Sequence, residues 1–279
     1  MTFKNNDVLD FYKELPFNIY GNFDAATEQI KKYDPLIVYP ELKKIFKKFK
    51  NTKIRIIDFG CGGGWLVNSL SYHHRDLVDV VGVDFNPVVI KYASSIKEKL
   101  NLSSKFYSSD IFTFKTDIKF DIIISLGVLH HTNNCPEAVK HVCSFHSSKS
   151  YLFLGLYHKY GRLPFLEHFS NMKDKSEDYK FSEYKKLHNI TDEKKLYSWF
   201  RDQVLHPHET QHTFEEIYPI IESSGYRITS TSINNFNKIS NKNEIIELEK
   251  TLSAYSKEKI NKLEYFPGFF IIVGEKNEK

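Results

Sequence analysis

The stretch IIDFGCGGGW, residues 56–65, joins an apolar run to a turn with glycines at positions 60, 62 and 64. The run IRII at residues 54–57 is typical of a buried strand, and the acid Asp58 follows it directly. Glycine permits positive φ angles and lets a backbone approach a ligand closely. The stretch therefore predicts a buried strand that leads into a ligand-binding turn.

The spacing of the glycines separates two kinds of nucleotide site. A dinucleotide site has the pattern Gly-x-Gly-x-x-Gly, which would need a third glycine at position 65, where this chain has Trp65. The carboxylate of Asp58 would also repel a pyrophosphate, whereas a ligand that carries an ammonium and a sulfonium tolerates a nearby acid. We therefore favour a sulfonium methyl donor over a dinucleotide.

Strand patterns and helix patterns alternate along the chain around this turn. Helical spacing of apolar residues begins at Pro87, for example, and Thr213 and Gly225 bound another predicted helix. This alternation predicts an α/β fold, with a doubly wound, mostly parallel sheet that binds ligands at the carboxyl ends of its strands. The predicted strands are residues 54–57, 78–83, 105–108, 120–125, 151–156, 226–232 and 269–274.

Acidic residues follow the second and third predicted strands. Asp84 lies 24 positions after Gly60 (84 − 60), and a carboxylate there can accept both hydroxyls of a ribose. Asp110 can accept the amino group of an adenine, and Ile111 can pack on its ring. The fourth strand leads into LGVLHH, residues 126–131. These features predict a site for an adenosyl ligand.

Together, these motifs resemble the class I S-adenosylmethionine (SAM)-dependent methyltransferases, in the branch with the ubiquinone/menaquinone-biosynthesis and type 11/12 enzymes. Residues 52–157 and the terminal strand at 268–274 carry the resemblance. It implies a seven-stranded Rossmann-like sheet whose last strand is antiparallel, with SAM as the cofactor. The cofactor-binding residues that it implies are Asp58, Gly60, Cys61, Gly62, Gly64, Asp84, Phe85, Asp110, Ile111 and Leu126, with Cys61 as a small packing residue of the turn and not a nucleophile.

Candidate residues for the acceptor follow from residue type. An acceptor that must lose a proton needs a base, and imidazole titrates near neutral pH. His130, His131 and His206 are therefore the predicted catalytic residues, with helix-start packing as the alternative for His130 and His131. Arg162 or Arg201 would suit an acceptor carboxylate or phosphate. The other predicted substrate-binding residues are Tyr157, Tyr160, Trp199 and His208.

A metal site is the alternative for the histidines at 206, 208 and 212, because their spacing permits one. Pro207 interrupts a simple helix there, and SAM chemistry needs no metal, so we predict none.

Four parts of the chain are distinguished by pattern. Residues 1–50 are predicted to form an N-terminal helical cap, 51–156 the SAM-binding core and 157–212 a helical substrate lid, while 213–279 complete the core sheet. The cap and the lid segments are rich in aromatic and charged residues, and both are candidates to cover the carboxyl edge of the sheet.

Composition agrees with a soluble globular enzyme. The 279 residues are 41% hydrophobic and 27% charged, and the net charge of +4 is too weakly basic to indicate nucleic-acid binding by itself. Three cysteines without a CxxC pair, together with no apolar segment in residues 1–10, predict a reduced, cytoplasmic protein without a signal peptide. Apolar runs are far shorter than the ~20 residues that span a bilayer.

These observations predict a SAM-dependent methyltransferase that acts by in-line displacement on an O, N or C nucleophile of a small molecule. One alternative is a SAM-binding protein without transferase activity. The other is an RNA methyltransferase for a tRNA nucleoside, whose basic face would be the lysines at 43, 44, 47, 48 and 50. The sequence specifies neither the acceptor nor an oligomeric state.

Overall fold

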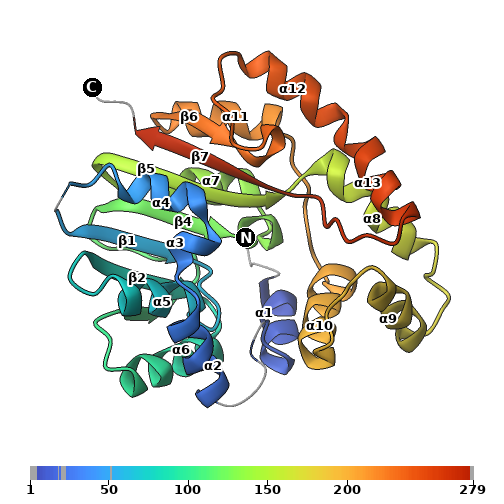
Figure 1. Ribbon diagram of the computed structural model, residues 1–279, viewed down its shortest axis with the longest axis horizontal. Helices are drawn as coiled ribbons and strands as arrows, with labels where there is room; N and C mark the ends of the chain where they lie inside the picture. The colour runs from blue at the N-terminus through green and yellow to red at the C-terminus, as the bar shows by residue number, and fades with distance from the viewer. Residues whose placement is uncertain (1–4, 18, 20–22, 51, 277–279) are drawn as a thin grey trace.

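A seven-stranded sheet lies at the centre of the computed structural model, which describes residues 5–17, 19, 23–50 and 52–276 (Figure 1). The strand order is β3-β2-β1-β4-β5-β7-β6. Strands β1 to β5 pair in parallel, and β7 is antiparallel to both of its neighbours, which confirms the predicted doubly wound sheet and its antiparallel last strand. The strands are β1 Ile54–Phe59, β2 Val78–Asp84, β3 Lys105–Ser108, β4 Phe120–Leu126, β5 His146–Tyr157, β6 Tyr226–Thr231 and β7 Phe269–Lys276.

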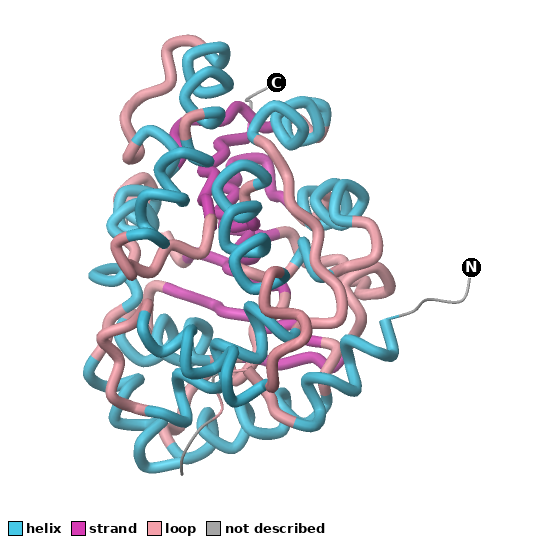
Figure 2. The backbone as a smooth tube through the Cα atoms, turned by 90° about the vertical axis from the view of Figure 1, so that its right-hand side faces the viewer, coloured by secondary structure: helices cyan, strands magenta, loops and turns pink. Residues whose placement is uncertain are grey.

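Helices cover both faces of the sheet (Figures 1 and 2). One face packs against α7, α11 and α12, and the other packs against α3, α4 and α5. The helices are α1 Asn5–Glu14, α2 Phe23–Lys32, α3 Pro35–Val38, α4 Pro40–Phe46, α5 Trp65–His73, α6 Pro87–Lys99, α7 Cys135–Cys143, α8 Lys159–Ser170, α9 Glu177–Lys186, α10 Glu193–Phe200, α11 Phe214–Ser223, α12 Lys242–Lys250 and α13 Leu252–Asn261.

The central strand β4 shows why the strands are apolar without interruption. Ile122, Ile123 and Ile124 are all fully buried. Successive strand residues point to opposite faces, so Ile123 enters one hydrophobic cluster while Ile122 and Ile124 enter the other. A sheet covered on both faces therefore needs consecutive apolar residues, which is the pattern read as strand in the sequence.

The fifth predicted strand is longer in the structure. Strand β5 begins at His146 and not at residue 151, because His146 pairs with Phe120 before an irregularity in the register. The bounds of α11 are confirmed: Thr213 forms a capping box with Glu216, and Gly225 follows the helix with a φ of 84°.

The lid segment forms a small hydrophobic core of its own. Aromatic and aliphatic side chains of α8, α9 and α10, such as Phe165, Tyr184 and Phe200, are buried against each other. Helix α1 lies beside α10 (Figure 1), whereas α3 and α4 pack on the sheet. The predicted cap of residues 1–50 is thus divided, because only α1 lies with the lid. Residues 1–4, 18, 20–22, 51 and 277–279 of the predicted parts lie outside the described ranges.

None of the helices that the structure describes combines the length and apolar character needed to cross a bilayer.

A buried carboxylate, Glu249 of α12, joins three parts of this fold. Its oxygens accept hydrogen bonds from the N–H groups of Phe214 (2.5 Å) and Glu215 (3.3 Å) at the start of α11. One of them also lies 2.8 Å from Nε2 of His158, which follows β5, and both side chains are 1% exposed. Glu249 therefore links α12 to the start of α11 and to the junction between β5 and the lid.

Replacing Glu249 with Ala should lower the free energy of unfolding by about 2–4 kcal/mol, because it leaves buried donors unsatisfied. Urea denaturation measures this loss. Glu247→Ala on the same helix removes only an exposed ion pair with Lys250 and should leave the urea midpoint almost unchanged. Equal effects of the two substitutions would contradict the bridging role of Glu249.

Candidate functional site

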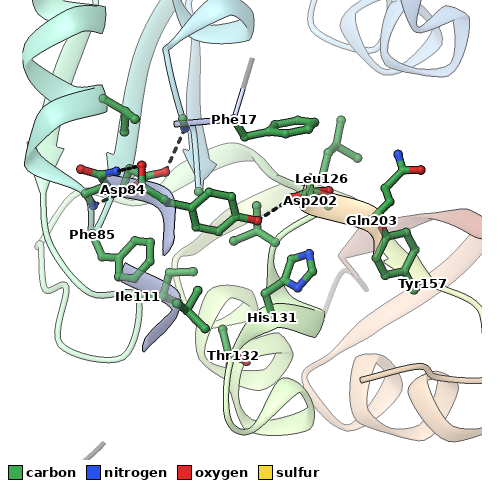
Figure 3. Close-up of a pocket in the computed structure, with 18 of the residues that line it drawn as sticks. Phe17, Asp84, Phe85, Ile111, Leu126, His131, Thr132, Tyr157, Asp202 and Gln203 are labelled. Carbon is green, nitrogen blue, oxygen red and sulfur yellow. Dashed lines mark hydrogen bonds between the residues drawn. The ribbon is translucent and has the colours of Figure 1, made fainter. Parts of the chain in front are cut away.

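A cavity of about 460 Å³ lies at the carboxyl edge of the sheet, where the sequence placed the chemistry. Gly60 follows β1 in its wall, Asp84 ends β2, Leu126 ends β4 and Tyr157 ends β5. Figure 3 shows Asp84 and Phe85 on one side of the cavity and Tyr157, Asp202 and Gln203 on the other, with His131 between them. Helix α1, the lid and the segment that leads into β7 supply most of the remaining wall.

The glycine turn is held in a left-handed conformation. Gly60 has a φ of 74° and donates its N–H to the carbonyl of Val83 at 2.7 Å. A Cβ on Gly60 would lie 2.3 Å from Cγ2 of Val128, whereas one on Gly62 would meet no atom within 4 Å. Gly60 and Gly62 both line the cavity. The turn thus brings bare backbone to the cavity wall, as predicted.

Two predicted members of the turn face the protein interior. A Cβ on Gly64 would lie 2.6 Å from that of Ala93 on α6, so Gly64 permits close packing of α5 on α6. Cys61 is buried with its Sγ against Gly82 of β2. Neither lines the cavity. The packing role predicted for Cys61 agrees with this position, and a direct ligand contact by Gly64 does not.

Asp84 is fixed by two backbone donors. Its Oδ2 accepts from the N–H of Gly62 and its Oδ1 from the N–H of Asn86, both at 2.9 Å. Asp58, at the end of neighbouring β1, is buried and does not line the cavity. Burial and the charge of Asp84 raise the pKa of Asp58 to about 8, and burial raises the pKa of Asp84 to about 6. A cationic ligand at this turn would relieve the repulsion between the two carboxylates.

The next two loops complete the same side of the cavity. Phe85, Asp110, Ile111 and Phe112 all line it. Oδ1 of Asp110 accepts from the N–H of Phe112 at 2.8 Å, which fixes the loop after β3. The rings of Phe85 and Phe112 form an apolar surface with the Ile111 side chain, next to the carboxylates. Such a surface suits a flat base joined to a sugar.

The imidazole of His131 lies in the cavity wall, between the two sides that Figure 3 shows. Its Nδ1 lies 2.9 Å from the carbonyl oxygen of His208, and because a carbonyl only accepts, Nδ1 carries the hydrogen. Nε2 is then the basic nitrogen, and it is buried without a hydrogen-bond partner among the described residues. Burial lowers the pKa of His131 to about 4, so the ring is neutral at physiological pH.

The other two histidines predicted as catalytic lie behind the wall. His130 is fully buried, and its Nδ1 accepts from the N–H of Tyr157 at 3.3 Å. The ring of His206 stacks on His131, with centroids 3.8 Å apart, and its Nδ1 accepts from the N–H of His208. Neither lines the cavity. In the structure the rings of His130 and His206 thus pack behind the cavity wall, and His131 is the predicted catalytic histidine that lines it.

The predicted anion-binding arginines are both occupied elsewhere. The guanidinium of Arg162 is fully buried, makes two bonds to Glu209 at 2.7 and 3.0 Å, and lies 4.0 Å from the ring centroid of Tyr157. Arg201 pairs with Glu14 of α1 at 2.8 Å. Neither side chain lines the cavity, and each is paired with a carboxylate instead.

The remaining predicted substrate residues are divided in the same way. Tyr157 and Trp199 line the cavity. Tyr160 of α8 lies beside His158. Nε2 of His208 donates to the carbonyl of Thr132 at 3.1 Å. Neither Tyr160 nor His208 lines the cavity. Across the described ranges, no three His, Cys, Asp or Glu side chains are grouped to hold a metal ion, the histidines at 206, 208 and 212 included.

Several wall residues were missed by the sequence reasoning. Tyr12 of α1 donates its hydroxyl to Oδ1 of Asp202 at 2.5 Å, across 190 residues of chain. Gln203 follows Asp202 in the π-helical turn at residues 201–205, where it accepts from the hydroxyl of Tyr184 in the lid and donates to the hydroxyl of Tyr265, which precedes β7. Asp202 and Gln203 stand in a stretch rich in polar and aromatic residues, which is a weak signal. Tyr12 carried no signal, because only tertiary folding brings α1 to the cavity.

The sequence matches the family described as a methyltransferase domain over residues 50–204, more than half of the chain. A ubiquinone biosynthesis O-methyltransferase of Rickettsia felis is 22% identical over 132 residues, which are 47% of this chain and 52% of that protein. The chain thus spans about half the length of the curated relatives it matches.

Solved structures share the fold. The magnesium protoporphyrin IX methyltransferase of Synechocystis PCC 6803, solved with bound S-adenosylhomocysteine (SAH), has a TM-score of 0.55 and 17% identity, with 98% of this chain and 96% of that chain covered. PKMT2 from Rickettsia typhi has a TM-score of 0.64 and 15% identity, with 94% and 55% covered. Both likenesses establish the Rossmann-like methyltransferase architecture.

Replacing Gly60 with Ala should lower the free energy of unfolding by at least about 1–2 kcal/mol, the cost of a left-handed alanine, because Val128 must also move. Urea titration measures the change. Gly63→Ala is the matched control in the same turn: Gly63 is not among the glycines with positive φ, and only the flexible side chain of Ile19, at 3.2 Å, must yield. A larger loss at Gly63 than at Gly60 would show that the turn is wrongly described.

Proposed function

The chain belongs to the methyltransferase-domain family as a class I SAM-dependent methyltransferase, and we propose that it transfers the methyl group of SAM to a small-molecule acceptor. One observation carries the proposal. A single cavity joins a carboxylate-lined half, made by the loops after β1, β2 and β3, to an aromatic half made by α1, the lid and the segment from Tyr265 to Phe269, with the imidazole of His131 in the wall between them.

The first half fits the cofactor by charge and by shape. Asp58 and Asp84 form a buried acidic pair whose repulsion a cationic ligand relieves, and the surface of Gly62 leaves room for a ligand to touch the backbone. We assign the methionine part to the glycine turn, the ribose to Asp84, and the adenine to Phe85, Asp110 and Ile111. Leu126 then faces the sulfur.

His131 is the residue that we assign to proton transfer. SAM, when bound, supplies an electrophilic methyl group on a positively charged sulfur. The acceptor's lone pair forms the new bond to carbon, the sulfur keeps the electrons of the broken C–S bond, and Nε2 of His131 takes the proton that an O–H or N–H acceptor loses. The His208 carbonyl holds the imidazole in the basic tautomer and orients it for this role.

Position argues for a small molecule over RNA. The lysines at 47, 48 and 50 directly precede β1, and Nζ of Lys149 near the start of β5 reaches the carbonyl of Lys48. They thus lie at the amino edge of the sheet, whereas the cavity lies at the carboxyl edge. A basic surface on the opposite edge does not guide a polyanion to the methyl donor.

Asp84→Asn should weaken SAM binding by about 10–100-fold, the loss of a charge-assisted hydrogen bond of ~1.5–3 kcal/mol. The ribose hydroxyls bind the ionised carboxylate, and the pKa of Asp84 in the free protein is about 6. Wild-type affinity should therefore fall as pH drops below 6, by roughly tenfold per unit, whereas the variant should show a weaker pH dependence.

Isothermal titration calorimetry with SAM, SAH and NAD measures these affinities between pH 5 and 8. The proposal requires SAM and SAH to bind and NAD not to bind. Heat with NAD alone would refute it.

His131→Phe should reduce methyl transfer by ~10²–10⁴-fold if the acceptor loses a proton, with SAH affinity within a few-fold of wild type. The assay follows label from methyl-labelled SAM into a fractionated metabolite extract. The control is His141→Phe, which removes another imidazole with a buried, unpartnered Nε2 that does not line the cavity. Equal activity of both variants would exclude His131 as the base.

A further inference from the structure

The acceptor half of the cavity, made by Tyr12, Tyr157, Trp199, Asp202, Tyr265 and Phe269, has an unusual charge balance. No lysine or arginine lines any part of the cavity among the described residues, although Asp202 contributes a carboxylate. An anionic acceptor would therefore meet a negative charge without a compensating cation. The sequence predicted an arginine for an anionic acceptor, whereas the acceptor half of the structure contains a carboxylate.

Asp202 is held at this wall by the fold. It lies in the π-helical turn after α10, is 9% exposed, and accepts the hydroxyl hydrogen of Tyr12. Burial is the largest influence on its pKa, which is raised. A carboxyl group with one neutral donor in an apolar wall gains from a ligand that brings a positive charge.

The nearby cations are neutralised before they reach this wall. Arg162 lies behind the ring of Tyr157 and is bound by both carboxylate oxygens of Glu209, and Arg201 is turned toward Glu14 and the ring of Phe11. The imidazoles of His131 and His206 are neutral, because burial lowers both pKa values, to about 4 and about 3. Within the described part of the chain, no positive charge is therefore available to an acceptor anion in this part of the cavity.

The rings around Asp202 provide the second element of cation recognition. Trp199 and Tyr265 have centroids 6.3 Å apart at an interplanar angle of 34°, and the rings of Tyr157 and Phe269 are 6.2 Å apart at 85°. All four line the cavity with Tyr12. Aromatic faces attract ammonium groups, and the attraction grows when water is excluded.

We infer that the acceptor half recognises an amine in its ammonium form, held on Asp202 among these aromatic rings, and that Asp202 determines specificity against acids. The inference rests on the proposed function, since it concerns the acceptor side of the same cavity. It describes recognition only: the ammonium anchors the acceptor, while the nucleophile lies at His131.

Three probes of matched size test the inference by calorimetry on the SAH-loaded protein: 2-phenylethylamine, 2-phenylethanol and 3-phenylpropanoate. The amine should bind at least tenfold more tightly than the alcohol, and the acid should bind weakest. Asp202→Asn, whose side-chain oxygen can still accept from Tyr12, should remove the preference for the amine. Asp174→Asn, an exposed aspartate of the same lid, should preserve it.

Tyr12→Phe separates recognition from a merely structural role. It removes the hydrogen bond between α1 and Asp202 but keeps the carboxylate, so the preference for the amine should persist. If Asp202 only fastened α1 to the lid, Tyr12→Phe and Asp202→Asn would have the same effect.

Equal binding of the three probes, tighter binding of the acid, or no binding of the amine at millimolar concentration would overturn the inference. If the wild-type protein did not bind SAH at all, the proposed function would be refuted instead. The two failures are therefore distinguishable.

Discussion

Two acids meet at the carboxyl ends of β1 and β2 because parallel strands present their ends at one edge. Asp58 pairs in register with Gly82, two residues before Asp84. The left-handed glycine turn then aims the Gly62 N–H at Asp84, so that the carboxylate is fixed without a cation. A fixed carboxylate thus stands where bare backbone reaches the cavity, and it favours a ligand that brings hydrogen-bond donors or a positive charge.

The acceptor side is built by different means. The loops of the sheet carry the cofactor half, whereas the acceptor half depends on packing between α1, the lid and the segment before β7. Arg162 is central to that packing, since it joins α8 to Glu209, to the carbonyl of Gln203 and to the ring of Tyr157. The buried guanidinium supports the cavity wall from behind. Its charge is neutralised within the protein by Glu209.

Charged and imidazole side chains were therefore the least predictable part of the site. Arg162 and Arg201 have the residue type of anion ligands, yet each found an acidic partner in the fold. Of three histidines predicted as catalytic, His131 alone faces the cavity, because one turn of 3-10 helix at residues 129–131 points His130 toward Tyr157 instead. Sequence gives the chemistry of such groups and not the direction in which they point.

The sequence by itself determined the sheet, the glycine turn and the acids at strand ends, because these depend on local periodicity and on a fixed rule of parallel topology. Gly60, Gly62, Asp84, Asp110 and Ile111 were all found at the cavity on that basis. Only the tertiary structure decided the acceptor half. Tyr12 and Asp202 are 190 residues apart, and no local pattern encodes their contact, because it arises from the packing of α1 against the lid.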